Sequence, residues 1–396
     1  MILKEIAKVV DCPHSTAPDE GEGYPLIRTP NIGRGRFILD GVHRVSEEVY
    51  HLRNRRIVPD DGDIIFAREA PAGNAAIIKN GLKVCLGQRT VLIRPNKEKV
   101  NPDYLVYYIL SPLQQAKLLG YAHGATVGHV NIPDIENLEI RLPDLLVQEK
   151  IAGVITAYDS LIELNNKRIK LLTQMAENLY KEWFVRFRFP GHETAEFENG
   201  VPKGWKIDTA DNLYDISIGK TPSRKEFEWF TSNDENAVDW LSISDMKDVF
   251  VMKTSEQLTK EAIDNFNMFV VPAWTVMLSF KLTVGRVCFT SKPTASNEAI
   301  AHFKNVPENA REYLFCYLKY FDYSKLGNTS AIGNAVNSKI IKNMKITVPD
   351  EGVLNSFHDI SNIVFSNILK LMKANENLIK QRDLLLPRLM SGKLEV

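Results

Sequence analysis

The segment IAGVITAYDSLIELNNKRIKLLTQMAENLYKEW, residues 151–183, decides how this chain folds. Its apolar residues recur in alternating steps of four and three, and this period of about 3.5 residues keeps one edge of a helix facing a partner helix. The predicted helix extends over residues 145–186 and, at about 1.5 Å per residue, would be about 60 Å long. So long a helix with so narrow an apolar edge needs a second helix to cover it.

A weaker form of the same pattern, at residues 361–385, supplies that second helix. Each pattern includes one asparagine in the middle of the seam, and a polar residue there lowers stability but fixes the register. The predicted seam consists of Ile151, Ile155, Tyr158, Ile162, Asn165, Ile169 and Leu172 on the first helix, and of Val364, Ile368, Leu371, Asn375, Leu378 and Leu385 on the second. The alternative is two independent amphipathic helices, each packed on a separate core.

The two helices belong to an internal repeat. Val130-Asn131 recurs 206 residues later as Val336-Asn337, and the helices match at an offset of 209, with Asn166 matching Asn375. Such colinear matches indicate a tandem duplication of a globular domain followed by a helix, with a period far above that of solenoid repeats. If the two copies face each other, their helices pair in an antiparallel coiled coil with pseudo-twofold symmetry.

The predicted fold class is therefore α+β, with two mixed α/β domains that are each followed by a long spacer helix. The predicted segments are 1–143 (first domain), 144–188 (first helix), 189–204 (linker), 205–349 (second domain) and 350–396 (second helix). Within the first domain, short β-type runs at residues 25–27, 63–66, 75–78 and 90–93 predict strands. Asn101-Pro102 predicts the start of a helix over residues 104–119, and the alternation of residues 135–143 predicts another strand.

Composition limits the possible functions. The chain has 49 basic and 49 acidic residues; residues 1–143 hold 18 and 17 of them, and residues 191–349 hold 18 and 20. Neutralising phosphates needs clustered Lys and Arg, so any nucleic-acid surface must be local or shared with a more basic partner. Four separated cysteines and no apolar run of 18 residues predict a reduced, cytoplasmic protein that does not cross a membrane.

Motifs that resemble catalytic sites lack their required context. Asn101-Pro102-Asp103-Tyr104 resembles a methyltransferase loop, but no Gly-rich cofactor loop precedes it, and it is explained as a helix cap. Gly219-Lys220-Thr221 resembles the end of a phosphate-binding loop, yet Tyr214 stands where that motif needs glycine. The histidines show no metal-ligand spacing. We therefore predict no catalytic residues, no cofactor and no metal.

The order of domain, helix, domain and helix resembles the DNA-specificity (S) subunit of Type I restriction–modification systems. Ile140-Arg141-Leu142-Pro143, followed by Val147-Gln148-Glu149-Lys150-Ile151-Ala152, is similar to that family's junction between domain and helix. Gly219-Lys220-Thr221-Pro222-Ser223-Arg224 resembles the opening turn of its target-recognition domains. Two features depart from the family: the second junction lacks the Gln-Glu pair, and the first domain lacks the lead-in seen at Pro202-Lys203-Gly204-Trp205.

This resemblance implies a non-catalytic subunit of a phage-defence complex. Each domain would read half of a split site in double-stranded DNA, and the helices would set the gap between the halves. Two methyltransferase (M) subunits would bind the helices and their flanks, and restriction (R) subunits would join through them. The assembled complex would be an adenine-N6 methyltransferase and an ATP-dependent endonuclease.

Polar and basic residues in loops are the DNA-facing candidates, since a rigid scaffold can present them to bases and phosphates. The candidates are Arg28, Asn31, Arg34, Arg36, Arg68, Gln88, Arg89, Thr126 and His129 in the first half, and Lys220, Ser223, Arg224, Lys281, Asn297, Asn328 and Asn334 in the second. Arg53, Arg55 and Arg56 form a further basic cluster. Each of these positions also fits a solvated surface or a plain connecting loop.

Three other functions stay open at this point. A coiled-coil adaptor that binds only proteins would show no salt-sensitive DNA binding. A recognition domain fused to a methyltransferase or nuclease would need a cofactor loop or an acidic cluster, and neither is visible in the sequence. The chain could also serve a methylation-only complex or another defence complex.

Overall fold

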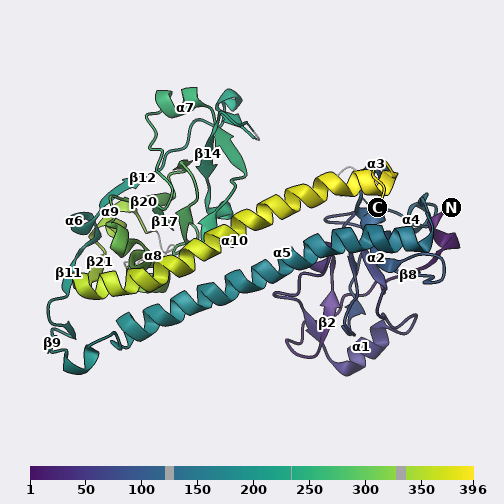
Figure 1. The fold of residues 1–396 in the computed structure, drawn as a ribbon, viewed down its shortest axis with the longest axis horizontal. Helices are drawn as coiled ribbons and strands as arrows, with labels where there is room; N and C mark the ends of the chain where they lie inside the picture. The colour runs from purple at the N-terminus through teal and green to yellow at the C-terminus, as the bar shows by residue number, and fades with distance from the viewer. Residues whose placement is uncertain (121–128, 233, 327–335) are drawn as a thin grey trace. The chain divides into compact units, whose positions relative to one another are not determined.

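The computed structural model describes residues 1–120, 129–232, 234–326 and 336–396 (Figure 1). Contacts divide the chain into two compact units. The first unit is Met1–Glu163 together with Asn377–Val396, and the second is Leu164–Glu376. Each unit therefore contains a globular part and one portion of both long helices, α5 (Leu145–Tyr180) and α10 (Glu351–Ser391).

The globular part of the first unit is built on a five-stranded sheet with the order β1-β8-β5-β6-β3. A three-stranded sheet, β4-β2-β7, lies beside it in the same unit. The elements are β1 (Ala7–Asp11), β2 (Tyr24–Ile27), β3 (Arg34–Gly35), β4 (Arg44–Val45), α1 (Glu47–Arg53), β5 (Ile64–Ala67), β6 (Ala75–Ile77), β7 (Cys85–Leu86), β8 (Thr90–Pro95), α2 (Pro102–Leu110), α3 (Pro112–Gly120) and α4 (Ile132–Glu136). The apolar face of α2 shares one core with this five-stranded sheet.

The second unit has a five-stranded sheet with the order β12-β20-β17-β18-β15 and a four-stranded sheet, β13-β16-β14-β19. Its strands are β9 (Phe197–Glu198), β10 (Val201–Pro202), β11 (Lys206–Thr209), β12 (Asp215–Ile218), β13 (Phe230–Thr231), β14 (Val238–Leu241), β15 (Phe250–Val251), β16 (Glu256–Leu258), β17 (Val276–Ser279), β18 (Val287–Thr290), β19 (Thr294–Ser296), β20 (Ile300–Lys304) and β21 (Lys345–Val348). Its short helices are α6 (Ala210–Leu213), α7 (Lys260–Asn265), α8 (Arg311–Tyr320) and α9 (Ser338–Asn343).

The two five-stranded sheets repeat one topology, which confirms the predicted duplication. In each sheet only the last strand pair is parallel, β3 with β6 and β15 with β18. The registers also match: Leu92 lies between Val10 and Ile65 in the first sheet. His302 holds the same place in the second sheet, between Ser217 and Met277. Equivalent residues of the two units can therefore be assigned from strand pairing alone.

The long helices pair in antiparallel fashion in both units. In the first unit, Ile155 near the start of α5 shares a core with Leu386 near the end of α10. In the second unit, Ala176 and Tyr180 of α5 pack in one core with Phe365 of α10. The structure therefore excludes independent helices. None of the predicted seam residues is exposed.

Asparagines form a hydrogen-bonded layer in the seam of the second unit. Asn165 Nδ2 donates to Asn375 Oδ1 at 2.9 Å, and Asn375 Nδ2 donates to Asn166 Oδ1 at 2.8 Å. The side chains of Asn165 and Asn375 are buried, so sliding one helix along the other would leave buried amides without partners. The predicted seam asparagines therefore do meet, and their hydrogen bonds oppose a change of register.

In the first unit, an ion pair between Asp159 and Arg382 holds the same two helices in register. Asp159 of α5 accepts hydrogen bonds from the Tyr107 hydroxyl of α2 and from Arg382 of α10, both at 2.6 Å. Burial raises the pKa of Tyr107, which keeps its hydroxyl protonated as a donor. Gly35 of β3 lies against this group, and a Cβ there would be 3.2 Å from the Tyr107 ring. Asp159 thus connects the domain to both long helices.

Two local predictions were wrong. The helix expected over residues 104–119 is in fact two helices, α2 and α3, because Pro112 disfavours a helical conformation at Ser111 and begins α3. The predicted cap at Asn101 is present: its side chain accepts a hydrogen bond from the Tyr104 backbone N–H at 3.0 Å. The strand expected over residues 135–143 starts instead in α4 and forms one isolated bridge, Ile2 to Glu139. The matching segment of the second unit, β21, is a strand because β11 pairs with it.

Removing Arg382 tests the charged contact. Arg382→Leu should lower the opening free energy of the helix end at Asn377–Val396 by on the order of 3 kcal/mol, because a shielded carboxylate loses its partner. Hydrogen exchange of peptides from this segment measures the change. Lys117→Met in the same unit, which breaks an exposed pair with Glu139, should change stability by less than about 1 kcal/mol. Equal effects of the two variants would contradict a structural role for Asp159.

His302 makes the stability of the second unit depend on pH. Its ring is buried, with Nε2 2.6 Å from Ser296 Oγ, and burial lowers its pKa to about 4. The unfolded chain, with a histidine pKa of about 6.5, therefore binds more protons than the fold between these two values, so stability falls as pH falls through this window.

His302→Gln should remove about 3 kcal/mol of this pH dependence between pH 7 and pH 4. Tryptophan fluorescence can follow the transition, because all five tryptophans lie in the second unit. The control His192→Gln, at a half-buried surface histidine of the same unit, should keep the wild-type pH dependence. Parallel pH curves for wild type and His302→Gln would refute the assignment.

Candidate nucleic-acid interface

One end of the first sheet gathers polar residues from three strands. Because β8 runs antiparallel to both β1 and β5, the chain leaves β1 and β5 at the edge where it enters β8. Four of the predicted candidates, Arg68, Gln88, Arg89 and His129, meet here. We call this group the first strand-end cluster; its members are Asp11, His14, Arg68, Glu69, Gln88, Arg89 and His129.

Arg68 is the buried member of this cluster and contacts two other members, Asp11 and His129. Its guanidinium donates to the Val130 carbonyl at 2.9 Å and to Asp11 Oδ1 at 3.1 Å. A third contact, at 2.6 Å, joins it to Nε2 of His129. With these partners Arg68 positions the surface residues, and the DNA-facing role predicted for it would be indirect.

The outer members of the first cluster reach solvent. The Arg89 side chain is exposed and pairs with Glu69 at 3.1 Å, while Glu69 also contacts His129 Nδ1 at 2.6 Å. Gln88 is half-buried and donates to the His14 carbonyl. The Arg89 backbone has φ 64° in the tight turn before β8. Arg and Gln side chains that reach solvent can form bidentate hydrogen bonds with base edges.

The same edge of the second sheet gathers the candidates of the second half. Here the chain leaves β12 at Ile218 and β17 at Ser279, and it enters β20 at Ile300. We call the polar residues at this edge the second strand-end cluster: Lys220, Thr221, Arg224, Glu256, Lys281, Asn297 and Glu298. The sequence candidates Lys220, Arg224, Lys281 and Asn297 therefore lie together, and Ser223 is in the same turn.

Charge pairing and backbone contacts hold the second cluster. Arg224 binds Glu256 through two hydrogen bonds of 2.6 and 2.9 Å, and its guanidinium lies 4.4 Å from the centre of the Phe230 ring. Lys220 donates to the carbonyls of Phe266 and Asn267. Burial acts to raise the pKa of Glu298, but the hydrogen bond from Thr221 and the nearby cations Lys281 and Arg224 outweigh it and lower that pKa.

Close backbone contacts shape both edges. A Cβ on Gly219 would stand 2.2 Å from the Asn297 carbonyl oxygen, and one on Gly87 would stand 2.6 Å from that of Ile27. Glycine is therefore required where the strand ends approach the neighbouring turns. The Gly-Lys-Thr motif at residues 219–221 is explained by this packing.

Equivalent positions of the two clusters carry different side chains. Ala67 pairs with Thr90 as Ser279 pairs with Ile300. Two residues beyond these pairs, Glu69 of the first unit corresponds to Lys281 of the second, and Gln88 corresponds to Glu298. The scaffold is the same, but the pattern of charges and hydrogen-bond donors that it presents is not.

The remaining candidates of the first half lie apart from the cluster. Asn31 is buried. Its Oδ1 accepts from the Arg28 backbone N–H and its Nδ2 donates to the Ile38 carbonyl, so its side chain stabilises a turn. Arg34 is exposed but donates to the Leu110 carbonyl at 2.8 Å. Arg36 is exposed on the following turn. Thr126, Asn328 and Asn334 lie outside the described residues.

Sequence reasoning missed the acidic members of both clusters. Asp11, Glu69, Glu256 and Glu298 were not predicted, because acidic side chains repel phosphates and only the fold brings these four next to basic or hydroxyl partners. For Glu298 the sequence does contain a signal, because this residue directly follows the predicted candidate Asn297. Asp11, Glu69 and Glu256 pair with Arg68, Arg89 and Arg224, and Glu298 accepts a hydrogen bond from Thr221.

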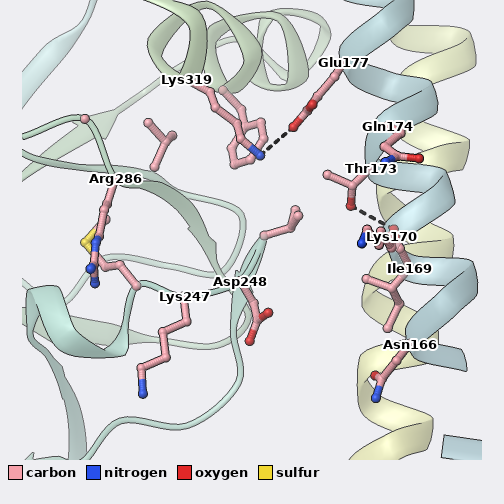
Figure 2. Close-up of a pocket in the computed structure, with 15 residues that line it drawn as sticks. Asn166, Ile169, Lys170, Thr173, Gln174, Glu177, Lys247, Asp248, Arg286 and Lys319 are labelled. Carbon is pink, nitrogen blue, oxygen red and sulfur yellow. Dashed lines mark hydrogen bonds and ion pairs between the residues drawn. The ribbon is translucent and has the colours of Figure 1, made fainter. Parts of the chain in front are cut away.

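A cleft of about 990 Å³ lies between α5 and the globular part of the second unit (Figure 2). Asn166, Lys170 and Gln174 of α5 lie on one wall, and Lys247, Asp248 and Arg286 lie on the other. Lys319 of α8 pairs with Glu177 of α5 at 2.6 Å. The mixture of both charges with amide groups suits a polypeptide better than a small anion.

The structure offers little for metal or thiol chemistry. Among the residues that it describes, no group of three His, Cys, Asp or Glu side chains could hold a metal ion. All four cysteines are buried and free, and burial raises the pKa of Cys85 to about 11. No described helix is long and apolar enough to span a membrane.

Comparison with known proteins now identifies the family. The family model "Type I restriction modification DNA specificity domain" matches residues 1–174 and again residues 202–380. The HindI specificity subunit of Haemophilus influenzae is 25% identical over 401 residues, which cover 84% of this chain and 86% of the relative. The MjaIX specificity subunit of Methanocaldococcus jannaschii is 26% identical over 373 residues, covering 91% and 84%.

A solved structure shares the fold. The Type I restriction–modification S subunit from M. genitalium superimposes with a TM-score of 0.57 at 13% identity, covering 98% of this chain and 95% of that one. The family model matches both halves of the chain, as the internal repeat requires. The chain therefore belongs to the family of Type I restriction–modification DNA specificity proteins.

Proposed function

We propose that this chain is the DNA-recognition subunit of a Type I restriction–modification complex, and that its two strand-end clusters read the two halves of a split site. One observation carries the proposal: the same sheet edge presents different polar side chains at equivalent positions in the two units. Repeated domains with one shared function would have no need of this difference. Two domains that read different bases would need different side chains at these positions.

The proposed contacts fall into two kinds. Exposed Arg89 and half-buried Gln88 in the first unit, and exposed Lys281 with half-buried Asn297 in the second, are proposed to meet base edges. The other basic candidates, Arg28, Arg34, Arg36, Lys220 and Arg224, are proposed to contact phosphates, which fix orientation without reading sequence. The proposed reading domains are residues 1–143 and 205–349. Each is followed by a helix, at 144–188 and 350–396, and the linker at 189–204 joins the first helix to the second domain.

The proposed partners are methyltransferase subunits that bind the long helices, with restriction subunits joining through them. In support, α5 carries an uncovered apolar stripe in the second unit, where Leu164, Leu171 and Met175 are 44%, 64% and 51% exposed. Their spacing of seven and four places them on one face of the helix. The adjoining cleft with its mixed polar walls could take part of the same partner (Figure 2). This complex would act on DNA in the cytoplasm, with its catalysis in the partner subunits.

Binding by the isolated chain should be weak and should strengthen with a methyltransferase partner. The reason is charge, because residues 1–143 and 191–349 have net charges of about +1 and −2 and offer little counterion release. A titration of a labelled duplex at fixed salt, with and without the partner, measures the difference. Leu171→Asp should abolish the gain from the partner, and the exposed control Lys203→Gln should not. Tight, sequence-specific binding by the chain alone would contradict the charge argument.

Helix length should set the gap between the half-sites. Inserting four residues between Asn165 and Ile169 adds about 6 Å and about one helical turn, which nearly preserves the seam. This is one to two base-pair steps of about 3.4 Å. Mapping methylated adenines in cells should therefore show a gap longer by one or two base pairs with both half-sites unchanged. A methylated site with new half-site bases and the old gap would refute the prediction.

A further inference from the structure

A small basic pocket lies beside the first strand-end cluster. It has a volume of about 330 Å³ and is formed by the segment that follows β1 and by the end of α1. Its polar lining residues are Ser15, Thr16, Arg53, Arg55 and Arg56. The lining thus contains three arginines, two hydroxyl groups and no acidic residue.

Arg53 lies at the base of this pocket. It is only 5% exposed, yet within the described ranges of the chain no carboxylate forms an ion pair with it. Its guanidinium donates to the carbonyls of Leu86 at 2.7 Å, Ser15 at 3.0 Å and Pro13 at 3.4 Å. A guanidinium has five N–H donors, so these contacts leave donors unused, and a buried cation without a counterion is unfavourable. Burial lowers the pKa of Arg53, and only the nearby thiols of Cys85 and Cys12 act against it, with no carboxylate doing so.

Arg55 and Arg56 complete the basic lining at the solvent side. Both are exposed. Arg56 donates to the Asp11 carbonyl at 3.3 Å, and the Asp11 side chain belongs to the first strand-end cluster through Arg68. The pocket is therefore next to the surface proposed to read bases.

The second unit solves the same packing problem without this pocket. In the first unit, Arg53 at the end of α1 donates to carbonyls of the segment after β1. In the second unit the donor and acceptor segments are exchanged: Lys220, in the segment after β12, donates to the carbonyls of Phe266 and Asn267 at the end of α7. Ser46 precedes α1 as Thr259 precedes α7, so these two residues align the two segments. In this alignment Met268 and Phe269 stand where the first unit has Arg55 and Arg56. The three arginines are thus a feature of the first unit, and the repeat supplies a natural comparison.

We propose that Arg53, Arg55 and Arg56 form a phosphate-binding site in the first unit. The planar fork of arginine matches phosphate oxygens, and the Ser15 and Thr16 hydroxyls can add donors. Given the proposed function on which this step rests, the phosphate belongs to the DNA backbone beside the bases read by the first unit. A phosphate held here would anchor that unit and fix its orientation on the duplex.

Two paired substitutions test the site in the full chain. Arg55→Gln with Arg56→Gln removes two exposed cations from the pocket and leaves the buried Arg53 in place. Lys4→Gln with Lys8→Gln is the matched control, because it removes two exposed cations near the opposite end of β1. Hydrogen exchange over residues 64–95, which include β5, β6, β7 and β8 of the first unit, should be the same in both variants and wild type in chloride, which checks that this unit stays folded.

The first measurement uses inorganic phosphate alone. Phosphate, compared with chloride at equal ionic strength, should slow hydrogen exchange at residues 47–56 in wild type and in the control. The Arg55→Gln, Arg56→Gln variant should lose this protection. If phosphate protects none of these proteins at residues 47–56, no built phosphate site exists and the proposal is overturned.

The second measurement uses duplex DNA with a methyltransferase partner present. The dependence of log K on log salt should become shallower by about one to two units in the Arg55→Gln, Arg56→Gln variant, for specific and unrelated duplexes alike, with the preferred bases unchanged. Lost phosphate protection with an unchanged salt slope would overturn the DNA backbone as the source and leave a site for free phosphate. If the wild-type complex fails to bind DNA at all, the proposed function falls, and the phosphate measurement still decides the site.

Discussion

The fold depends on burying one apolar edge of α5 against α10. Each large side chain removed from water at this seam contributes roughly 1.5–3 kcal/mol, and only a helix running in the opposite direction provides the matching edge. The contact joins residues far apart in the chain: Asp159 and Arg382 are separated by 223 positions. Neither unit can complete its core until the last helix has formed, because Leu386 and Leu389 of α10 lie in the core of the first unit.

Apolar burial alone would not choose a register, since a shift of one heptad would bury a similar surface. The polar groups make that choice. A shift would separate Asn375 from Asn165 and Asn166 in the second unit, and Arg382 from Asp159 in the first. Each displaced group would then be shielded from water without a partner, which costs more than the hydrogen bonds contribute when they are made. The two units use different chemistry, amides in one and an ion pair in the other, for the same purpose.

The sequence predicted features that depend on local pattern. The 3.5-residue period of α5, its asparagines and the cap at Asn101 each carry their physical reason within a few residues. Features decided by distant partners were not predictable in this way. The segment at residues 135–143 has strand-like alternation but finds only Ile2 to pair with, whereas its copy finds β11. Arg68 and Asn31 look like surface donors, and only the folded chain shows that protein carbonyls and carboxylates occupy their hydrogen bonds.

The correspondence between Glu69 and Lys281 has a consequence for how this chain can change over generations. Opposite charges stand at one place on one scaffold, and both sheets keep the same strand order. The support beneath them comes largely from backbone carbonyls and glycines, such as Val130 under Arg68 and Gly219 beside Asn297. Exchanging the exposed Arg89 or Lys281 therefore alters surface contacts worth less than about 1 kcal/mol and leaves the core untouched. Under the proposed function, recognition can therefore change by single substitutions at these exposed positions, without a compensating mutation to restore stability.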